Sequence, residues 1–289
     1  MNTMQDDNLS EDQRKALIET IKADPSYRLA FNDEELLMKD ELRPLRLQLE
    51  FTKPELYLRY HDIKSTIVLF GSTRIHPPSE VQKQLDELLL KHTDSADGDV
   101  FDQAVQKARR QVELSRYYDE ARRFGQLITQ RFQQEHRRDF VIITGGGPGI
   151  MEAANRGAKD VGGLSVGLNI LLPHEQEPNP FITPGLCFQF HYFALRKMHF
   201  LLRAKALVAF PGGYGTIDEL FEALTLIQTH KMVKIPVILI GQSFWQKAIN
   251  FDFLVDEGVI ADEDLKLFKI ADRAEEAIDI LHDFYKVLP

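Results

Sequence analysis

The sequence predicts an α/β protein with a Rossmann-like, doubly wound parallel sheet of about seven strands and an N-terminal helical extension. Two observations lead to this fold. Short runs of valine, isoleucine and leucine alternate with longer stretches of helical character, and glycine-rich turns follow three of these runs. Continuous apolar runs separated by helical crossovers are typical of parallel strands that helices cover on both faces.

The first element is the extension, residues 1–63, which contains no glycine. Within it, apolar residues recur at helical spacing between Asp33 and Leu49. We expect helices here that pack on the main domain or on a second subunit. The main domain is expected to span residues 64–289.

Seven apolar runs are candidates for the strands of the sheet. The five strongest are Thr66–Gly71, Phe140–Thr144, Ser165–Ile170, Ala206–Phe210 and Val237–Gly241. Two weaker candidates are Cys187–Phe193 and Leu267–Ile270. The five strongest runs are short and apolar and contain valine, isoleucine or leucine, as buried strands do.

The first two strands are separated by a long helical excursion, residues 77–139. Its polar segment His92–Asp99 is expected to be a loop, and a long helix is expected from about Val100 to Gln134. Arginines recur along this helix among glutamates and aspartates. We interpret them as a solvated, charge-balanced face rather than a nucleic-acid surface.

The composition excludes several classes of function. The formal net charge is −9, which disfavours nucleic-acid binding, because that affinity depends on basic side chains. No apolar run approaches the roughly 20 residues that a membrane span needs. The lone Cys187 allows no disulfide within the chain and fits a reducing compartment. We therefore expect a cytoplasmic protein that binds neither nucleic acid nor membrane.

Three turns that contain glycine each follow a predicted strand, at the sheet edge where ligands bind in this fold. Their candidate binding residues are Gly71, Ser72, Thr73 and Arg74 in the first turn, Gly145, Gly146 and Gly147 in the second, and Gly212, Gly213, Tyr214, Gly215 and Thr216 in the third.

The second turn precedes a helix expected at Ala153–Lys159, and the third precedes one expected at Asp218–Thr229. A strand–glycine–helix junction presents backbone N–H groups at the positive end of a helix, which suits a phosphate. Glycine also lets an anion approach the backbone closely. None of the turns is a Walker loop, because no Lys-Ser or Lys-Thr pair follows.

The segment Pro211–Glu219 (PGGYGTIDE) matches the PGGxGTxxE signature of the Lonely Guy phosphoribohydrolases, which are often mislabelled lysine decarboxylases. Arg196-Lys197 falls at the position of that family's Arg-Lys pair, and GGGPGIMEAANRGA is similar to its first glycine motif. The resemblance covers about Lys64 to Lys286. The N-terminal extension resembles a longer, bacterial-looking branch of the family.

The resemblance implies hydrolysis of the N-glycosidic bond of a nucleoside 5′-monophosphate to free base and ribose 5-phosphate, without a cofactor. The substrate is then AMP-like, with a cytokinin riboside monophosphate as one candidate. The residues before the Arg-Lys pair, Phe193–Leu195, replace a stretch containing Met-His in cytokinin-activating members. This difference, like the N-terminal extension, bears on the identity of the base more than on the reaction.

Glu219 and Arg196 are the candidate catalytic residues. Cleaving a ribosyl–base bond develops positive charge on the sugar, which a nearby carboxylate such as that of Glu219 stabilises. A guanidinium such as that of Arg196 forks onto phosphate or ribose oxygens. Lys197 is a binding candidate by resemblance, although its place beside Arg196 favours a side chain that faces outward or contacts a partner.

Alternative functions remain open on the residues alone. The same turns suit a non-catalytic nucleotide-binding or sensing protein. A nicotinamide-dependent oxidoreductase ranks lower, because the turn after the first strand lacks G-x-G-x-x-G. No metal site is expected, since His191 and His199 lack partners at ligand spacing. A homo-oligomer, dimer or higher, is expected because the helix predicted at Arg196–Lys205 is apolar and the family's members associate.

Overall fold

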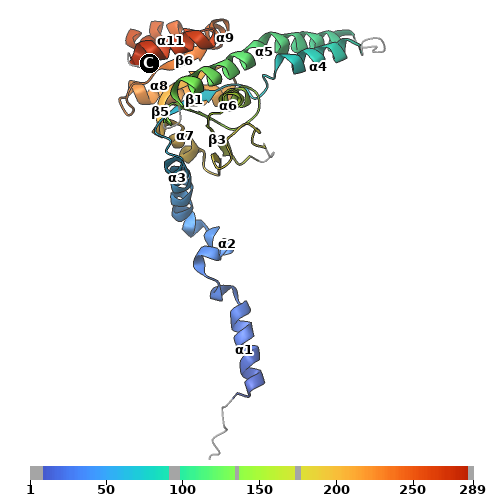
Figure 1. Cartoon of the computed structure of the whole chain (residues 1–289), viewed down its shortest axis with the longest axis vertical. Coiled ribbons are helices and arrows are strands. Elements are labelled where there is room, and N and C mark those ends of the chain that lie inside the picture. The colour runs from blue at the N-terminus through green and yellow to red at the C-terminus, as the bar shows by residue number, and fades with distance from the viewer. Residues whose placement is uncertain (1–8, 91–97, 134–136, 173–176, 286–289) are drawn as a thin grey trace, which may run out of the picture. The chain divides into compact units, whose positions relative to one another are not determined.

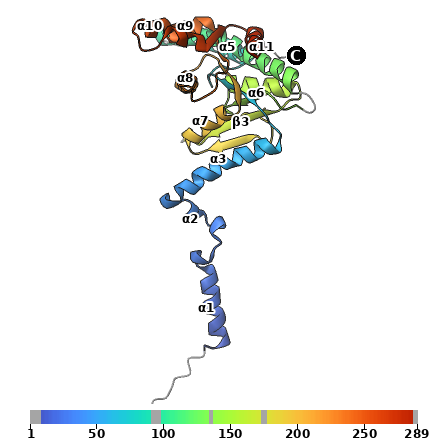
Figure 2. The same ribbon diagram turned by 90° about the vertical axis from the view of Figure 1, so that its left-hand side faces the viewer.

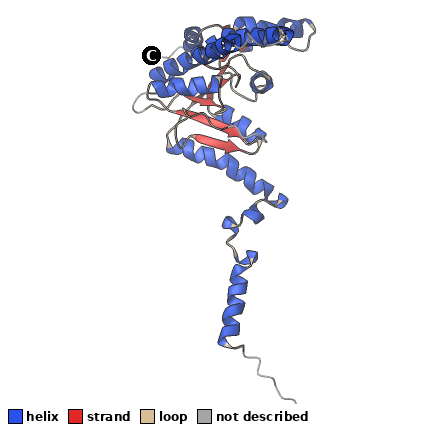
Figure 3. Cartoon of the chain, turned by 90° about the vertical axis from the view of Figure 1, so that its right-hand side faces the viewer, coloured by secondary structure: helices blue, strands red, loops and turns tan. Residues whose placement is uncertain are grey.

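The computed structural model describes residues 9–90, 98–133, 137–172 and 177–285. In this part of the chain, seven parallel strands form one sheet with the order β4-β3-β2-β1-β5-β6-β7. Helices flank this sheet, as Figure 3 shows. The predicted fold class is confirmed. The strands are β1 Thr66–Phe70, β2 Val141–Thr144, β3 Ser165–Ile170, β4 Cys187–Phe190, β5 Ala204–Ala209, β6 Val237–Ile240 and β7 Phe268–Ala271.

The chain divides into two units, residues 1–50 and 51–289. The first contains α1 Glu11–Ala23, α2 Glu34–Leu37 and three short 3-10 helices at Pro25–Tyr27, Ala30–Asn32 and Asp40–Leu42. No residue between 9 and 50 is buried. Helix α3, Arg43–Tyr60, crosses the division, so its second half belongs to the unit that carries the sheet.

The helices of the second unit connect the strands (Figures 1 and 2). They are α4 Pro78–Leu90, α5 Gly98–Phe132, α6 Ile150–Asp160, α7 Phe193–Leu202, α8 Tyr214–Gln228, α9 Gln242–Ala248, α10 Phe251–Asp256 and α11 Ala274–Tyr285, with a 3-10 helix at Asp262–Leu267. Most of the polar segment predicted as a loop, residues 91–97, lies outside the described residues, and Gly98 and Asp99 belong to α5. None of the described helices is both long and apolar enough for a membrane span.

Alternating strand residues supply the two faces of the core. Ile67 and Leu69 of β1 pack in the cluster that contains the buried residues of α5, α6 and α11. Val68 and Phe70 pack on the opposite face, with buried residues of α3, α7, α8 and α9. A strand buried on both faces has no polar side, which explains the continuous apolar runs in the sequence.

Helices α5 and α6 pack at very short range because each contributes a glycine to their contact. A Cβ atom on Gly125 would lie 2.5 Å from the Ala154 carbonyl oxygen, and one on Gly157 would lie 2.0 Å from that of Arg122. Beside this contact, Arg122 forms an ion pair of 2.6 Å with Asp160. This packing fixes α6, and with it the glycine turn that precedes α6, above β2.

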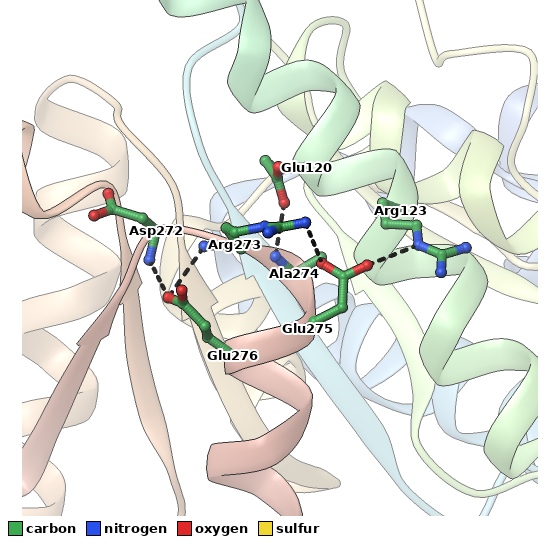
Figure 4. Close-up of polar contacts among 7 residues, drawn as sticks. All are labelled: Glu120, Arg123, Asp272, Arg273, Ala274, Glu275 and Glu276. Carbon is green, nitrogen blue, oxygen red and sulfur yellow. Dashed lines mark hydrogen bonds and ion pairs between the residues drawn. The ribbon is translucent and has the colours of Figure 1, made fainter.

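Carboxylates close the junction between β7 and α11. Glu120 of α5 accepts a hydrogen bond from the Ala274 amide at 2.7 Å. Glu276 accepts hydrogen bonds from the Asp272 amide at 2.8 Å and the Arg273 amide at 3.4 Å. Figure 4 shows these contacts. The positive end of α11 is thus neutralised by the protein itself.

Candidate active site

A cavity of about 670 Å³ opens at the carboxyl ends of the central strands. Strand β1 pairs with β2 on one side and with β5 on the other, so the chain reverses its strand order at this point. Ligands of doubly wound sheets bind at such a switch point. The residues that line the cavity are Phe70, Gly71, Ser72, Thr73, Arg74, Gly145, Met151, Asn169, Ile170, Leu172, Phe193, Arg196, Gly213, Tyr214, Gly215, Thr216, Ile217, Asp218 and Glu219.

Most of the site residues predicted from the sequence therefore line one cavity. Both catalytic candidates, Arg196 and Glu219, do so, together with the whole first turn and the third turn from Gly213 to Thr216. The predicted residues that do not line it are Gly146, Gly147, Lys197 and Gly212.

The third turn presents backbone amides to the cavity. Helix α8 begins at Tyr214, four residues before the predicted start, and Gly213 is its N-cap. The first amide with an acceptor is that of Ile217, which donates to the Gly213 carbonyl at 3.1 Å. Among the described residues, no atom accepts from the amides of Gly213, Tyr214, Gly215 or Thr216. These open donors at a helix N-terminus form an anion site.

Gly212 makes room for the Thr216 side chain within this turn. A Cβ atom at Gly212 would lie 2.1 Å from the Thr216 hydroxyl oxygen, so the Thr216 side chain packs directly against the glycine. Thr216 is consequently buried. Gly212 therefore acts through packing, whereas we expected it among the residues that bind phosphate.

In the second turn, Gly146 and Gly147 bond to the protein. The Gly146 amide donates to the Thr144 hydroxyl at 3.0 Å. The Asn179 side-chain amide donates to the carbonyls of Gly146, at 3.1 Å, and Gly147, at 3.0 Å. Gly146 has a φ of +74°, in the region that favours glycine. These contacts hold the loop in shape and leave Gly145 as its cavity-lining glycine.

Arg196 lies beneath the second turn, in α7. Its Nε donates to the Leu168 carbonyl of β3 at 2.8 Å, and its guanidinium carbon lies 5.2 Å from the centre of the Phe200 ring. A Cβ atom on Gly145 would come within 2.6 Å of an Arg196 terminal nitrogen, so this position needs glycine. Burial lowers the pKa of Arg196, and the nearby Glu219 opposes that shift.

Glu219 is a buried carboxylate, with 8% of its surface exposed. Burial raises the pKa of Glu219 to about 7, because the charged form loses hydration. The charges of Lys197 and Arg196 oppose this rise, and those of Glu222 and Asp218 add to it. No hydrogen bond from a described residue engages this carboxylate. It lies in the second turn of α8, which starts earlier than the sequence suggested.

Lys197 does not face outward as the sequence suggested. Its ammonium lies 3.0 Å from carboxylate oxygens of both Asp218 and Glu222, and 17% of its side chain is exposed. Those two residues flank Glu219 on α8. Lys197 therefore connects α7 to α8 and lowers the pKa of Glu219 without lining the cavity.

Comparison with known proteins identifies the family. The family model described as possible lysine decarboxylase matches residues 151–281. An uncharacterized protein of Archaeoglobus fulgidus is 31% identical over 138 residues, which is 46% of this chain and 83% of that protein. The cytokinin riboside 5′-monophosphate phosphoribohydrolase LOG of Oryza sativa subsp. japonica is 28% identical over 171 residues, 58% of this chain and 67% of that one. The chain belongs to the Lonely Guy family.

Further relatives of this Lonely Guy protein include an Arabidopsis thaliana cytokinin riboside 5′-monophosphate phosphoribohydrolase, 29% identical over 51% of this chain and 68% of that one. Among solved structures, the molybdenum cofactor binding protein of Rippkaea orientalis aligns with a TM-score of 0.42 at 22% identity, over 58% of this chain and 88% of that one. The Moco carrier protein of Chlamydomonas reinhardtii aligns with a TM-score of 0.41 at 20% identity, over 78% and 99%.

Several cavity residues of this Lonely Guy protein escaped the sequence analysis. They are Phe70, Met151, Asn169, Ile170, Leu172, Phe193, Ile217 and Asp218. Most lie within apolar runs, where a lining residue has the same appearance as a core residue. The described residues contain no group of three or more His, Cys, Asp or Glu side chains placed to hold a metal ion. His199 is buried against the rings of Phe51 and Phe190.

Proposed function

We propose that this protein hydrolyses the N-glycosidic bond of a nucleoside 5′-monophosphate, releasing the free base and ribose 5-phosphate. One observation carries the proposal: a buried carboxylate, Glu219, shares a cavity with the open amides of the helix on which it lies. The cavity volume falls in the range of small-molecule sites. AMP-like nucleotides are the substrate class, and the phosphoribohydrolase names of relatives support the reaction.

The 5′-phosphate binds at the start of α8. The amides from Gly213 to Thr216 donate to its oxygens, and the helix dipole favours its charge. Thr73 and Arg74 of the first turn are exposed at the cavity and reach the same group or its neighbour. Arg196, held by the Leu168 carbonyl, anchors ribose or phosphate oxygens with its terminal N–H groups.

Glu219 acts at the sugar. As the bond from C1′ to the base nitrogen breaks, its electron pair leaves with the base and positive charge develops on the ribose. The Glu219 carboxylate stabilises this charge and accepts a proton from the water that attacks C1′. The proton then passes to the base. Because its pKa is about 7, Glu219 is partly ionised at neutral pH and suited to both transfers.

A product-resolved assay tests the reaction. Purified protein is incubated with AMP, GMP, CMP, UMP, IMP and a prenylated AMP, and free base and ribose 5-phosphate are quantified. We expect both products in equal amounts from at least one of these nucleotides. Tight nucleotide binding without base release from any of them contradicts the proposal and indicates the non-catalytic binding protein instead.

A pair of variants assigns the carboxylate. Glu219→Gln is expected to lower kcat by about 10²–10⁴-fold, the usual contribution of a positioned acid–base group. Glu113→Gln is the control, since Glu113 is an exposed acid on α5 that does not line the cavity. The wild-type kcat/KM is expected to rise with pH and to reach half of its plateau value near pH 7. Full activity of Glu219→Gln removes Glu219 from the mechanism.

A further inference from the structure

Asn169 is a polar residue near the end of β3, with 7% of its surface exposed, and it lines the cavity. Its side-chain oxygen accepts a weak hydrogen bond from the Cys187 thiol, with an S–O separation of 3.4 Å. No described residue accepts a hydrogen bond from its side-chain NH₂ group. Because Asn169 lines the cavity, this NH₂ group is available to donate to a ligand there.

Neighbouring contacts place Asn169 next to Arg196. Successive glycines of the second turn abut the two side chains: a Cβ atom on Gly145 would meet Arg196 at 2.6 Å, and one on Gly146 would meet the Asn169 oxygen at 2.0 Å. Arg196 also donates to the carbonyl of Leu168, the residue before Asn169. The pKa of Arg196 responds in turn to Glu219. Arg196 therefore lies between Glu219 and Asn169 in the cavity.

The strand order indicates in which direction a bound nucleotide extends from Glu219 toward Asn169. Helix α8 follows β5, and β3 lies three strands away across β1 and β2. At roughly 4.8 Å per strand, β3 is about 14 Å from β5. A nucleotide whose phosphate lies at the start of α8, and whose ribose lies by Glu219, therefore extends its base toward β3.

Apolar residues surround Asn169 at that end. Ile170 and Leu172 follow it in the chain, and Phe193 begins α7; all three line the cavity. Phe193 is 53% exposed, so its ring is available for contact with a planar ligand. A flat apolar wall with one polar donor is a suitable site for a nucleobase.

We propose that the Asn169 side-chain NH₂ group donates a hydrogen bond to an acceptor atom of the base, a ring nitrogen or a carbonyl oxygen, while Ile170, Leu172 and Phe193 contact the ring. This inference rests on the proposed function. When the glycosidic bond breaks, its electron pair moves onto the base, and a donor at an acceptor atom stabilises that charge. Asn169 gives up no proton; the base receives the one that Glu219 took from water.

The test separates the base from the rest of the nucleotide. Asn169→Asp keeps the shape of the side chain and replaces its donor by an acceptor. Affinities for AMP and for ribose 5-phosphate, which lacks a base, are measured by calorimetry with and without Asn169→Asp in proteins that both carry Glu219→Gln, so that AMP is not consumed during the titration. We expect AMP to bind about tenfold or more weakly, the loss typical of a hydrogen bond to a buried group, while ribose 5-phosphate binds within about twofold of the Glu219→Gln parent. Equal losses for both ligands, or none, overturn the proposal.

Asn179→Asp is the matched control, because Asn179 is equally buried but bonds to the second turn and does not line the cavity. We expect it to lower thermal stability and to change both affinities alike. In kinetic assays, Asn169→Asp is expected to lower kcat, since the contact strengthens as the base departs. A rise in KM alone contradicts assistance to departure. The calorimetric arm needs no turnover, so an absence of hydrolysis refutes the proposed function without deciding the base contact.

Discussion

Two helices, α8 and α11, begin at the same edge of the sheet. The backbone amides at the start of α11 are paired with carboxylates of the protein, whereas those at the start of α8 are not. At α11, carboxylates from Glu120 and Glu276 occupy the amides of Asp272, Arg273 and Ala274 (Figure 4). At α8, no described residue accepts from the amides that face the cavity. The dipoles are equivalent. What distinguishes a structural junction from an anion site is whether the chain supplies its own anion.

The local sequences explain the contrast. The first turn of α11 contains Glu275 and Glu276, whereas the first turn of α8 contains no acidic residue. The first turn of α8 holds Gly215 instead, where a Cβ atom would meet no other atom within 4 Å. Its first buried acid is Glu219, beyond the amides. At the start of α8, the amides are therefore available to the phosphate of the proposed substrate, and the Glu219 carboxylate is available to its sugar.

The largest expected effect is on the free energy of unfolding, and it comes from Glu219, the buried acid of α8. The folded-state pKa of Glu219 is about 7, above its ordinary value of 4.5. Between these values the folded protein binds more protons than the unfolded chain, so the contribution of Glu219 to stability falls as pH rises. Above pH 7 the full loss, about 3 kcal/mol, is present. Glu219→Gln removes it.

Unfolding free energies from urea titrations at pH 5 and pH 8 measure this loss. Glu219→Gln should gain stability relative to wild type at pH 8 and much less at pH 5. Glu113→Gln is again the control, because it removes an exposed acid outside the cavity and leaves the charges around Glu219 unchanged. A difference between Glu219→Gln and wild type that is the same at both pH values would mean that Glu219 has an ordinary pKa.

The next effect concerns the amides themselves. Tyr214 is the first residue of α8, a position where proline fits the helix and deletes one N–H. Its side chain is 94% exposed, so removing the ring perturbs little packing. Tyr214→Pro should weaken ribose 5-phosphate binding by about 10–100-fold, the value of a charge-assisted hydrogen bond.

Tyr214→Ala removes the same ring and keeps the amide, so it isolates the missing N–H. Calorimetric titration of ribose 5-phosphate into both variants measures the difference. Equal affinities for the proline and alanine variants would show that this amide does not contact the anion, and would shift the phosphate toward the first turn.

The centre of the sheet was predictable because strands such as β1, β2 and β6 are buried on both faces. Runs such as Val237–Ile240 then contain no polar residue to obscure them, and their identity follows from composition alone. The start of α8 was harder to predict. Gly215 and Thr216 are poor helix formers, so propensity places the start at Asp218, while the structure begins the helix at Tyr214 because the glycine turn leads directly into it.

The sequence predicted only those site residues that belong to a recognisable motif. The third turn and Arg196 stand out locally, and the structure gathers them around one cavity. Asn169 gave no signal, because it sits within an apolar strand and only the sheet order brings it beside Arg196. Lys197 was misjudged because its carboxylate partners lie on α8, some twenty residues further along the chain. Such pairings depend on tertiary packing, which spacing along one segment does not reveal.

The smallest expected effect is on the free energy of unfolding, and it comes from the start of α11, where carboxylates pair with the amides. Glu120→Ala removes the carboxylate that accepts from the Ala274 amide and should lower the free energy of unfolding by about 1 kcal/mol, the usual value of a helix cap. Glu113→Ala makes the same substitution at an exposed position on α5 and corrects for helix propensity. Neither variant should change nucleotide affinity. Equal destabilisation of the two would mean that the Glu120 carboxylate contributes nothing to α11, and that a helix end at this edge tolerates unpaired amides without a ligand.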